Sequence, residues 1–287
     1  MPVLFRLLAV WPLPLLHALG WCVGWGMWLG SRRYRQRWAQ HTAWAGLSRR
    51  ERWLSVGEAG KQITELPRLW FGAPVQVGWQ GAAHIEAALQ HNQGILFLTP
   101  HMGCFEVTAQ AYAQRFGVDG QSTGHPTQPM TVLFRPPRNA NLLPVLQAAR
   151  QRPGLLTAPT TLRGVRQLAM ALKAGQAVGL LPDQVPPEGL GVWAPFFGHK
   201  AYTMTLSARL AQIPGTQVLL AWGERLPWGR GYVVHVQTWD DVMGQPMDLR
   251  ADEAAVQVNQ AMEHLVAQKP EQYLWGYARY KQPRKDW

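Results

Sequence analysis

One segment of the chain combines an imidazole with a carboxylate at a spacing that suits proton transfer. In Pro100-His101-Met102-Gly103-Cys104-Phe105-Glu106, four residues separate His101 from Glu106. On one continuous helix these side chains would point about 140° apart, so we expect His101 at a strand end and Glu106 in the first turn of the next helix. A carboxylate that accepts the N–H of an imidazole leaves the other ring nitrogen able to take a proton. The alternative is that Glu106 only caps the helix and that His101 has no chemical role.

Further candidates follow two other expected strands. Arg135 comes directly after the apolar run at 130–134, and Asp183 and Gln184 follow the run at 177–181. In an open α/β sheet, ligands bind outside the carboxyl ends of the strands. We therefore expect a base, a cation and an acid on one rim of the sheet.

The elements that position these residues alternate between short apolar runs and amphipathic stretches. Such alternation predicts an α/β domain with a mostly parallel sheet flanked by helices, and we assign it residues 32–287 as a single domain. The expected strands are 95–99, 130–134, 155–158, 177–181, 217–222 and 232–237; the expected helices are 49–70, 105–116, 141–150, 162–173, one from Thr203, and 252–268.

The N-terminal segment indicates a membrane anchor over residues 1–31. Residues 7–29 carry no charge, and a helix of that length would roughly reach across a ~30 Å hydrocarbon core. A signal peptide is excluded, because the segment ends in bulky Trp and then Arg. Two prolines and His17 favour the alternative of a helix lying in one leaflet. The cluster that follows would hold this side in the cytoplasm by the positive-inside rule: Arg32, Arg33, Arg35 and Arg37.

The composition limits the classes of partner. The 287 residues include 28 Lys+Arg and 17 Asp+Glu, a net charge of +11, so we expect an anionic partner. The basic clusters adjoin the apolar anchor and no nucleic-acid motif accompanies them, so membrane headgroups are favoured over nucleic acid. Arg166 lies three residues after Arg163 on an expected helix, as part of a solvated face or as a second phosphate contact. Two cysteines match no zinc spacing, so we expect no metal.

Two groups could suggest covalent catalysis. Gly120-Gln121-Ser122-Thr123-Gly124 matches the Gly-x-Ser-x-Gly pattern of serine hydrolases, but its flanks are typical of a loop, and a nucleophile elbow needs a strand before it and a helix after it. Cys104 is better explained as a small hydrophobe on the buried side of a helix start than as a thiol nucleophile. Neither group is expected to react.

Four blocks in order resemble the lipid A biosynthesis (lauroyl or myristoyl) acyltransferases, within the wider glycerolipid acyltransferase group. The segment 94–106 resembles the family's His-x4-Asp/Glu block. The other three blocks are Arg135-Pro136-Pro137-Arg138-Asn139, then Asp183-Gln184 with Pro195-Phe196-Phe197-Gly198, and Pro270-Glu271-Gln272-Tyr273-Leu274-Trp275. The match covers most of the chain, and it also implies the N-terminal anchor.

The resemblance implies transfer of an acyl chain from acyl carrier protein to a hydroxyl of a lipid A precursor, without an acyl-enzyme or a cofactor. His101 would be the general base and Glu106 would hold its ring, so replacing either with alanine should remove most turnover. Arg135 would bind a phosphate, with Asn139 and Arg166 as further substrate contacts. Asp183 and Gln184 would orient Arg135 or the loop at Phe197 and Gly198.

The same resemblance implies a cellular location, while alternatives for the donor, the acceptor and the function stay open. The enzyme would lie at the bacterial inner membrane with its catalytic domain facing the cytoplasm, and +11 would help it dock an acidic carrier protein and a phosphorylated lipid. Acyl-CoA remains an alternative donor, and another membrane lipid an alternative acceptor. A non-enzymatic membrane scaffold is the rival from another class.

Overall fold

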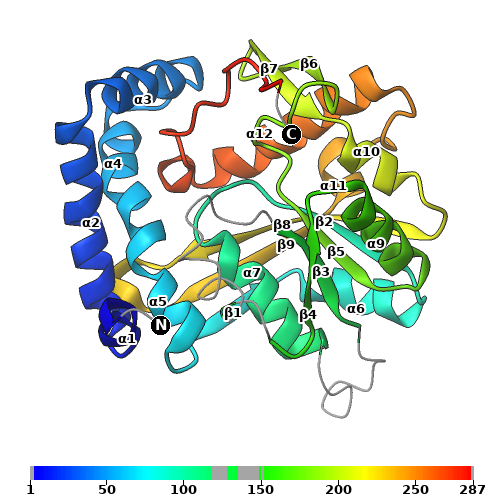
Figure 1. Cartoon of the computed structure of the whole chain (residues 1–287), viewed down its shortest axis with the longest axis horizontal. Helices are drawn as coiled ribbons and strands as arrows, with labels where there is room; N and C mark the ends of the chain where they lie inside the picture. The colour runs from blue at the N-terminus through cyan, green and yellow to red at the C-terminus, as the bar shows by residue number, and fades with distance from the viewer. Residues whose placement is uncertain (1–2, 118–127, 135–148, 150–151, 286–287) are drawn as a thin grey trace.

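The computed structural model describes residues 3–117, 128–134, 149 and 152–285 (Figure 1). Arg135, Asn139, the Gly-x-Ser-x-Gly segment at 120–124 and nearly all of the expected helix 141–150 lie outside the described residues.

A seven-stranded sheet forms the centre of the molecule, in the order β1-β9-β8-β2-β5-β3-β4. Every neighbouring pair is parallel except β8 and β9, which confirms the mostly parallel sheet. The bounds are β1 Val77–Gln80, β2 Gly94–Leu98, β3 Met130–Phe134, β4 Leu155–Pro159, β5 Ala177–Leu180, β8 Thr216–Arg225 and β9 Tyr232–Thr238.

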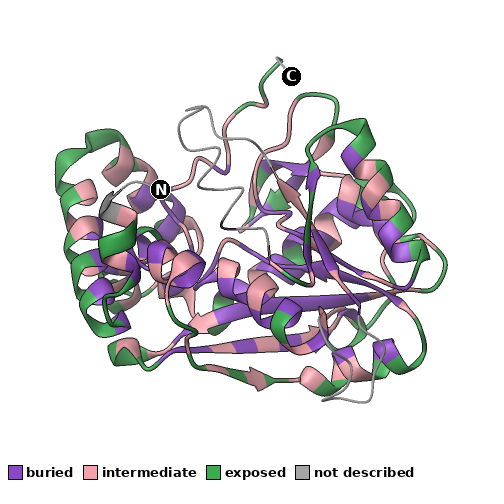
Figure 2. Ribbon diagram, turned by 60° about the horizontal axis from the view of Figure 1, so that its bottom comes forward, coloured by how far each residue is buried: buried purple, intermediate pink, exposed green. Residues whose placement is uncertain are grey.

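Helices cover both faces of this sheet. Alternate residues of β2 enter two separate cores, with Leu96 and Leu98 on one side and Ile95 and Phe97 on the other, as the period of two in a strand requires. Figure 2 shows the strands as largely buried. One core is closed by α9 Leu162–Lys173, α10 Leu206–Ala211, α11 Trp239–Met243 and α12 Ala251–Gln268; the other is closed by α5 Leu66–Phe71, α6 Ala82–Gln90 and α7 Phe105–Tyr112, which continues as a π-helical turn Ala113–Gly117.

A β-hairpin replaces part of an expected helix. Residues Gly191–Phe196 (β6) and His199–Met204 (β7) pair antiparallel, and the helix that we predicted from Thr203 begins at Leu206. The connecting residues Phe197 and Gly198 have φ of 46° and 74°. Two successive residues with positive φ form the tight turn that matches the twist of paired strands. β1 and α6 were not predicted.

The N-terminal helices lie at one end of the sheet (Figure 1). They are α1 Val3–Ala9, α2 Leu13–Gly30, α3 Arg32–Trp44 and α4 Arg49–Thr64. Helix α2 packs on α4 and contacts α3, and α1 packs on α5. A Cβ on Gly60 of α4 would lie 2.0 Å from the Gly20 carbonyl oxygen, and one on Gly24 would lie 2.2 Å from that of Val56, so glycine is required for this close approach. The expected helix 49–70 is divided at Glu65 into α4 and α5.

The uncharged N-terminal stretch is also divided, at Pro12. Among the described residues, no helix combines the length and apolarity that crossing a membrane requires.

Candidate active site

The register of two neighbouring parallel strands brings His101 next to Asp183. Leu98 of β2 pairs with Leu180 of β5. From these partners the chain advances by the same three residues in each case, through Pro100 to His101 and through Pro182 to Asp183. Both side chains therefore emerge at the same level of the carboxyl edge, where ligands of open α/β sheets bind.

Asp183 holds His101 through two hydrogen bonds, one to the imidazole and one to the backbone. The His101 Nδ1 lies 2.7 Å from Asp183 Oδ1, and the backbone N–H of His101 donates to Oδ2 at 2.8 Å. The amide nitrogen of Gln184 lies 2.9 Å from Nε2 on the other side of the ring. An ionised Asp183 selects the tautomer with hydrogen on Nδ1, and a donated N–H from Gln184 meets the lone pair on Nε2. This is the protonation state that a general base needs.

The environment of Asp183 favours the carboxylate form. Its side chain is 2% exposed, whereas that of His101 is 16% exposed. Burial raises the pKa of Asp183, but the charge and two hydrogen bonds of His101, with the charge of Arg279, bring that pKa below its ordinary value. Asp183 therefore accepts hydrogen bonds as an anion near neutral pH.

The pairing of His101 with Glu106 that we predicted from their spacing stays a prediction, because the contacts described for the imidazole are to other residues. Glu106 does begin α7, but both ring nitrogens of His101 are engaged by Asp183 and Gln184, and a hydrogen bond to Glu106 comes from the Trp70 indole at 3.5 Å. Asp183 and Gln184, which we expected to orient Arg135 or the loop at Phe197 and Gly198, both contact the imidazole. The equal advance past Leu98 and Leu180 could have indicated the Asp183 pairing, had the strand register been known.

The turn between His101 and α7 is held by backbone hydrogen bonds. Gly103 has φ of +53°, and a Cβ there would lie 2.0 Å from the Gly223 carbonyl oxygen. Its N–H donates to the Gln272 carbonyl at 2.9 Å, and the N–H of Leu274 donates to the His101 carbonyl at 3.1 Å. The closing block 270–275 thus fixes the backbone around the imidazole.

A buried arginine, Arg225, also holds the turn between His101 and α7. Arg225 donates to the carbonyl oxygen of Gly103 at 2.9 Å, to both carboxylate oxygens of Glu65 at 2.6 and 2.8 Å, and to Glu58 at 2.9 Å. The Arg225 and Glu65 side chains are each 1% exposed. Burial raises the pKa of Glu65, but the charge and hydrogen bonds of Arg225 lower it to about 2. The pair is therefore ionised and links the turn to the residue between α4 and α5.

Helix α2 joins this buried group through His17. Its Nε2 lies 3.2 Å from Glu65 Oε2, and the Tyr232 hydroxyl donates to the same oxygen at 2.9 Å. His17, the polar residue of the uncharged stretch, is thus turned towards protein.

The remaining predicted residues lie on other elements of the structure or begin the next helix. Phe197 occupies the β6–β7 turn, where its N–H donates to Glu263 at 2.6 Å and its ring centroid lies 5.5 Å from that of Trp275. Gly198 is the second residue of this turn. Arg166 is exposed on α9, which begins just past the end of β4. Cys104 is buried, and burial raises the pKa of its thiol well above the ordinary value, as suits a packing residue.

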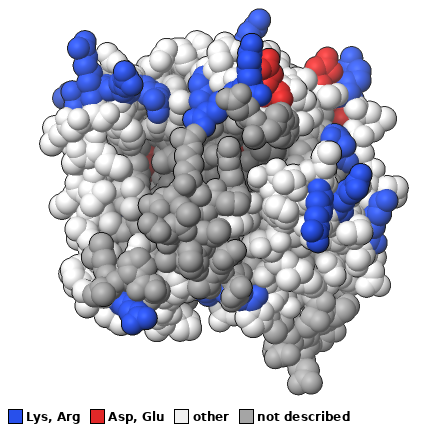
Figure 3. Space-filling view, in the orientation of Figure 1, with Lys and Arg blue, Asp and Glu red and all other residues white. Residues whose placement is uncertain are grey.

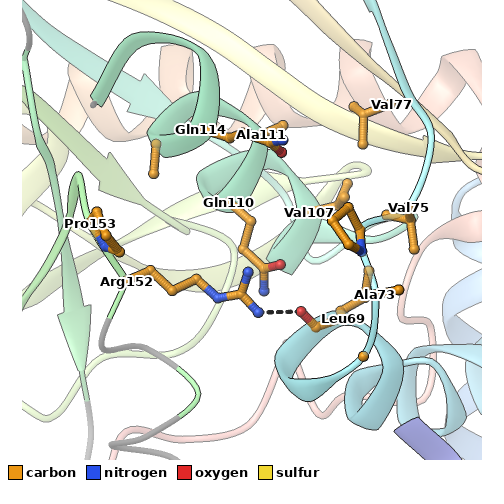
Figure 4. A pocket seen from close by; sticks show the side chains of 13 residues that line it. Leu69, Ala73, Val75, Val77, Val107, Gln110, Ala111, Gln114, Arg152 and Pro153 are labelled. Atoms are coloured by element: carbon orange, nitrogen blue, oxygen red, sulfur yellow. Dashed lines mark hydrogen bonds between the residues drawn. The ribbon is translucent and has the colours of Figure 1, made fainter. Parts of the chain in front are cut away.

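A cavity of about 360 Å³ lies beside α7 (Figure 4). Its walls are largely aliphatic and include Val107 and Ala111 of α7. Arg152 and Gln110 add polar groups at one side, and Arg152 donates to the carbonyl oxygens of Leu69 and Trp70. A largely apolar wall with a few polar groups is the usual lining of a small-molecule site, and this volume suits a short apolar chain.

Basic side chains are unevenly distributed on the surface. In Figure 3, Lys and Arg side chains lie along the upper edge, including the corner where Figure 1 draws α3, and form another group on the right side of the view. Arg32 and Arg33 at the start of α3 are exposed. This edge adjoins the end of α2, so an uncharged helix and a basic surface are neighbours.

Comparisons with known proteins add a family to this geometry. A family model described as bacterial lipid A biosynthesis acyltransferase matches residues 54–282. The chain is 26% identical over 228 residues to the lipid A biosynthesis palmitoleoyltransferase of Escherichia coli (strain K12), covering 77% of this chain and 68% of the relative. It is 26% identical over 230 residues to the lauroyltransferase (77% and 69%) and 25% identical over 205 residues to the myristoyltransferase (70% and 57%) of the same strain.

Proposed function

Because the chain belongs to the bacterial lipid A biosynthesis acyltransferase family, we propose that it transfers a fatty acyl chain from an acyl-carrier-protein thioester to a hydroxyl of a lipid A precursor. The observation that carries this proposal is the contact between His101 and Asp183 at the carboxyl edge of the sheet. Membership makes the chain an acyltransferase of lipid A biosynthesis; the donor, the acceptor group and the mechanism are parts of the proposal.

His101 acts as the general base. The acceptor hydroxyl takes the position of the Gln184 amide at Nε2, and its oxygen attacks the thioester carbonyl carbon as its proton passes to the imidazole. The C–S bond of the tetrahedral intermediate then breaks, and the imidazolium returns the proton to the leaving thiolate. Asp183 stabilises the imidazolium between these steps. No acyl-enzyme is formed.

Substrate binding draws on the basic residues. Arg135, Asn139 and Arg166 are proposed to contact phosphate or the donor's pantetheine arm, on the strength of the sequence blocks and the chemistry of guanidinium. The net charge of +11 favours docking of an acidic carrier protein and a phosphorylated lipid.

The test is turnover by the purified protein. With acyl carrier protein loaded with a fatty acid and a lipid A precursor that carries a free hydroxyl, mass spectrometry should find one added acyl chain. His101→Ala should lower the rate by roughly 10²–10⁴-fold, the usual contribution of a general base. Parallel reactions with acyl-CoA and with a lysophospholipid identify the donor and acceptor. If the wild-type protein turned over no combination of donor and acceptor, the result would contradict this proposal and favour the non-enzymatic membrane scaffold.

We further propose that α2 lies in the interface of the inner membrane, with the active site on the cytoplasmic side. Its outer face is apolar and exposed at positions spaced for one side of a helix: Leu15 (54%), Leu19 (37%), Cys22 and Leu29 (66%). Its other face packs on α4, and the exposed arginines of α3 begin where it ends. An apolar face beside cations suits insertion among anionic headgroups.

Binding to lipid vesicles tests this orientation. We expect cosedimentation with vesicles that contain anionic phospholipid, and a roughly tenfold or greater loss of binding in Leu15→Asp/Leu19→Asp, because each aliphatic side chain contributes about 1.5–3 kcal/mol when buried. The matched control is Leu249→Asp, an apolar residue 79% exposed on the segment before α12. Equal binding of all three proteins would contradict the proposal.

A further inference from the structure

Helix α9 exposes one face that combines cations with apolar side chains. Its exposed residues are Leu162, Arg163, Arg166, Met170 and Lys173, and we call these five residues the α9 face. With 3.6 residues per turn, their positions fall within about 100° of the helix circumference, so they point the same way. Leu162 is 78% exposed and Met170 is 61% exposed. Arg and Met are among the residues that are enriched in protein–protein interfaces.

The α9 face carries positive charge without paired anions. Neither α9 nor the adjoining α10 contains an acidic residue, and α10 adds a further exposed cation, Arg209. Among the residues that the structure describes, the side chains of Arg163, Arg166, Lys173 and Arg209 form no ion pair. Figure 3 shows basic side chains gathered on the right of the view, where Figure 1 draws α9 and α10. This surface therefore attracts an acidic partner.

The α9 face starts at the edge of the sheet that carries the base. Helix α9 begins directly after Thr161, two residues past the end of β4, and β3 and β5 lie between β4 and β2. Three strand spacings of about 4.8 Å put the end of β4 roughly 14 Å from the end of β2, which His101 follows. A phosphopantetheine arm has about as many bonds as five residues of extended backbone and spans roughly 17 Å. A carrier protein bound near the start of α9 can therefore present its thioester to His101.

The α9 face lies away from the surface that we propose to meet the membrane. In Figure 1, α2 lies at the left end of the molecule and α9 at the right end. The apolar side of α2 is turned away from α4, on which this helix packs. A flat bilayer against α2 would therefore not reach α9, so an acidic protein in the aqueous phase suits the α9 face better than anionic lipid does.

We propose that the α9 face is where the acyl carrier protein docks to deliver its acyl chain. Carboxylates of this acidic protein pair with the cations of α9 and with Arg209, and its apolar side chains cover Leu162 and Met170. The inference rests on the proposed function for its donor, and it adds the place where the donor binds.

Charge reversal tests the docking position directly. Arg163→Glu/Lys173→Glu alters the α9 face, and Arg32→Glu/Arg33→Glu makes the matched change at the start of α3. In each case two cations become anions, so the net charge of +11 falls by four. Fluorescence anisotropy of labelled acyl carrier protein, measured without lipid, gives the Kd. We expect Kd to rise on the order of tenfold or more in the α9 variant and to stay near the wild-type value in the α3 variant.

Other results would contradict docking on α9. An equal rise of Kd in both variants would mean that only the overall charge matters, and an unchanged Kd in the α9 variant would exclude this face. Loss of binding to anionic vesicles in the α9 variant, with an unchanged Kd, would assign the face to the membrane. Circular dichroism checks that each variant is folded. If the double variant does not fold, Arg209→Glu on α10 takes its place and should also raise Kd.

Kinetics separate this inference from the proposed function, because acyl-pantetheine carries the same thioester without the protein. In Arg163→Glu/Lys173→Glu, the KM for acyl carrier protein should rise on the order of tenfold, whereas the KM for acyl-pantetheine should change much less. An equal KM for acyl carrier protein in the variant and the wild type would refute docking on α9 and leave the proposed reaction intact. Binding of the carrier protein through α9 without acyl transfer by the wild type would refute the proposed reaction and leave the docking surface intact.

Discussion

Asp183→Asn is expected to lower kcat of acyl transfer by roughly 10²–10⁴-fold while the protein remains folded. In the structure the carboxylate accepts hydrogen bonds from the His101 ring and backbone at 2.7 and 2.8 Å. An asparagine can turn its amide nitrogen towards Nδ1, which then accepts, and the ring proton moves to Nε2. The nitrogen that should take the hydroxyl proton would lose its lone pair. Steady-state kinetics with circular dichroism as the folding check measures this.

Glu106→Gln is the matched control for this loss. Glu106 is the carboxylate expected from the His-x4-Glu spacing, and it accepts a hydrogen bond from the Trp70 indole at 3.5 Å. We expect its kcat to fall much less than that of Asp183→Asn, since the ring is held without it. A larger loss in Glu106→Gln would restore the pairing predicted from the spacing and contradict the geometry at Asp183.

Arg225→Leu is expected to lower the free energy of unfolding by about 3–5 kcal/mol, because it leaves the buried Glu65 carboxylate without its cation. It also removes the donor to the Gly103 carbonyl, so the turn that carries His101 loosens. Urea denaturation of the wild type and the variant gives the difference.

Two further variants serve as comparisons for the stability loss of Arg225→Leu. Arg230→Leu, at an exposed arginine before β9, should change stability by no more than about 0.5 kcal/mol. Arg225→Leu/Glu65→Leu should recover part of the loss, since an apolar pair avoids the isolated charge.

In the wild type, the pKa of Glu65 is lowered from 4.5 to about 2. The contribution of the Glu65 carboxylate to the free energy of unfolding is therefore present above pH 4.5 and is lost as pH falls towards 2. Equal stability of Arg225→Leu and the wild type would contradict the role of this pair.

Local signals were sufficient for most of the sheet and its helices. The predicted bounds of β3 and α9 agree with those found, because an apolar run between turn residues and a 3.6-residue period are properties of the segment itself. The hairpin β6–β7 was missed where a helix was expected from Thr203. The Thr203 hydroxyl bonds to Asn259 of α12, a partner 56 residues away that no local pattern indicates.

The uncharged N-terminal stretch shows the same limit. A run without charge indicates apolar surroundings, and both a lipid bilayer and a protein interior provide them. Gly20 and Gly24 allow α2 to lie against α4, and His17 finds Glu65 there. The sequence therefore predicted the apolar surroundings, and the packing of α2 on α4 decided that one face meets protein.

By itself the sequence determined that an imidazole and a carboxylate share one edge of the sheet, because His101 and Asp183 both follow apolar strands and the ends of parallel strands meet at one edge. Only the tertiary structure decided which carboxylate holds His101. That choice depends on Leu98 pairing with Leu180, and strand register is set by contacts between residues far apart in the chain. Glu106 is near in sequence, but Asp183 is the carboxylate that this register brings to the imidazole.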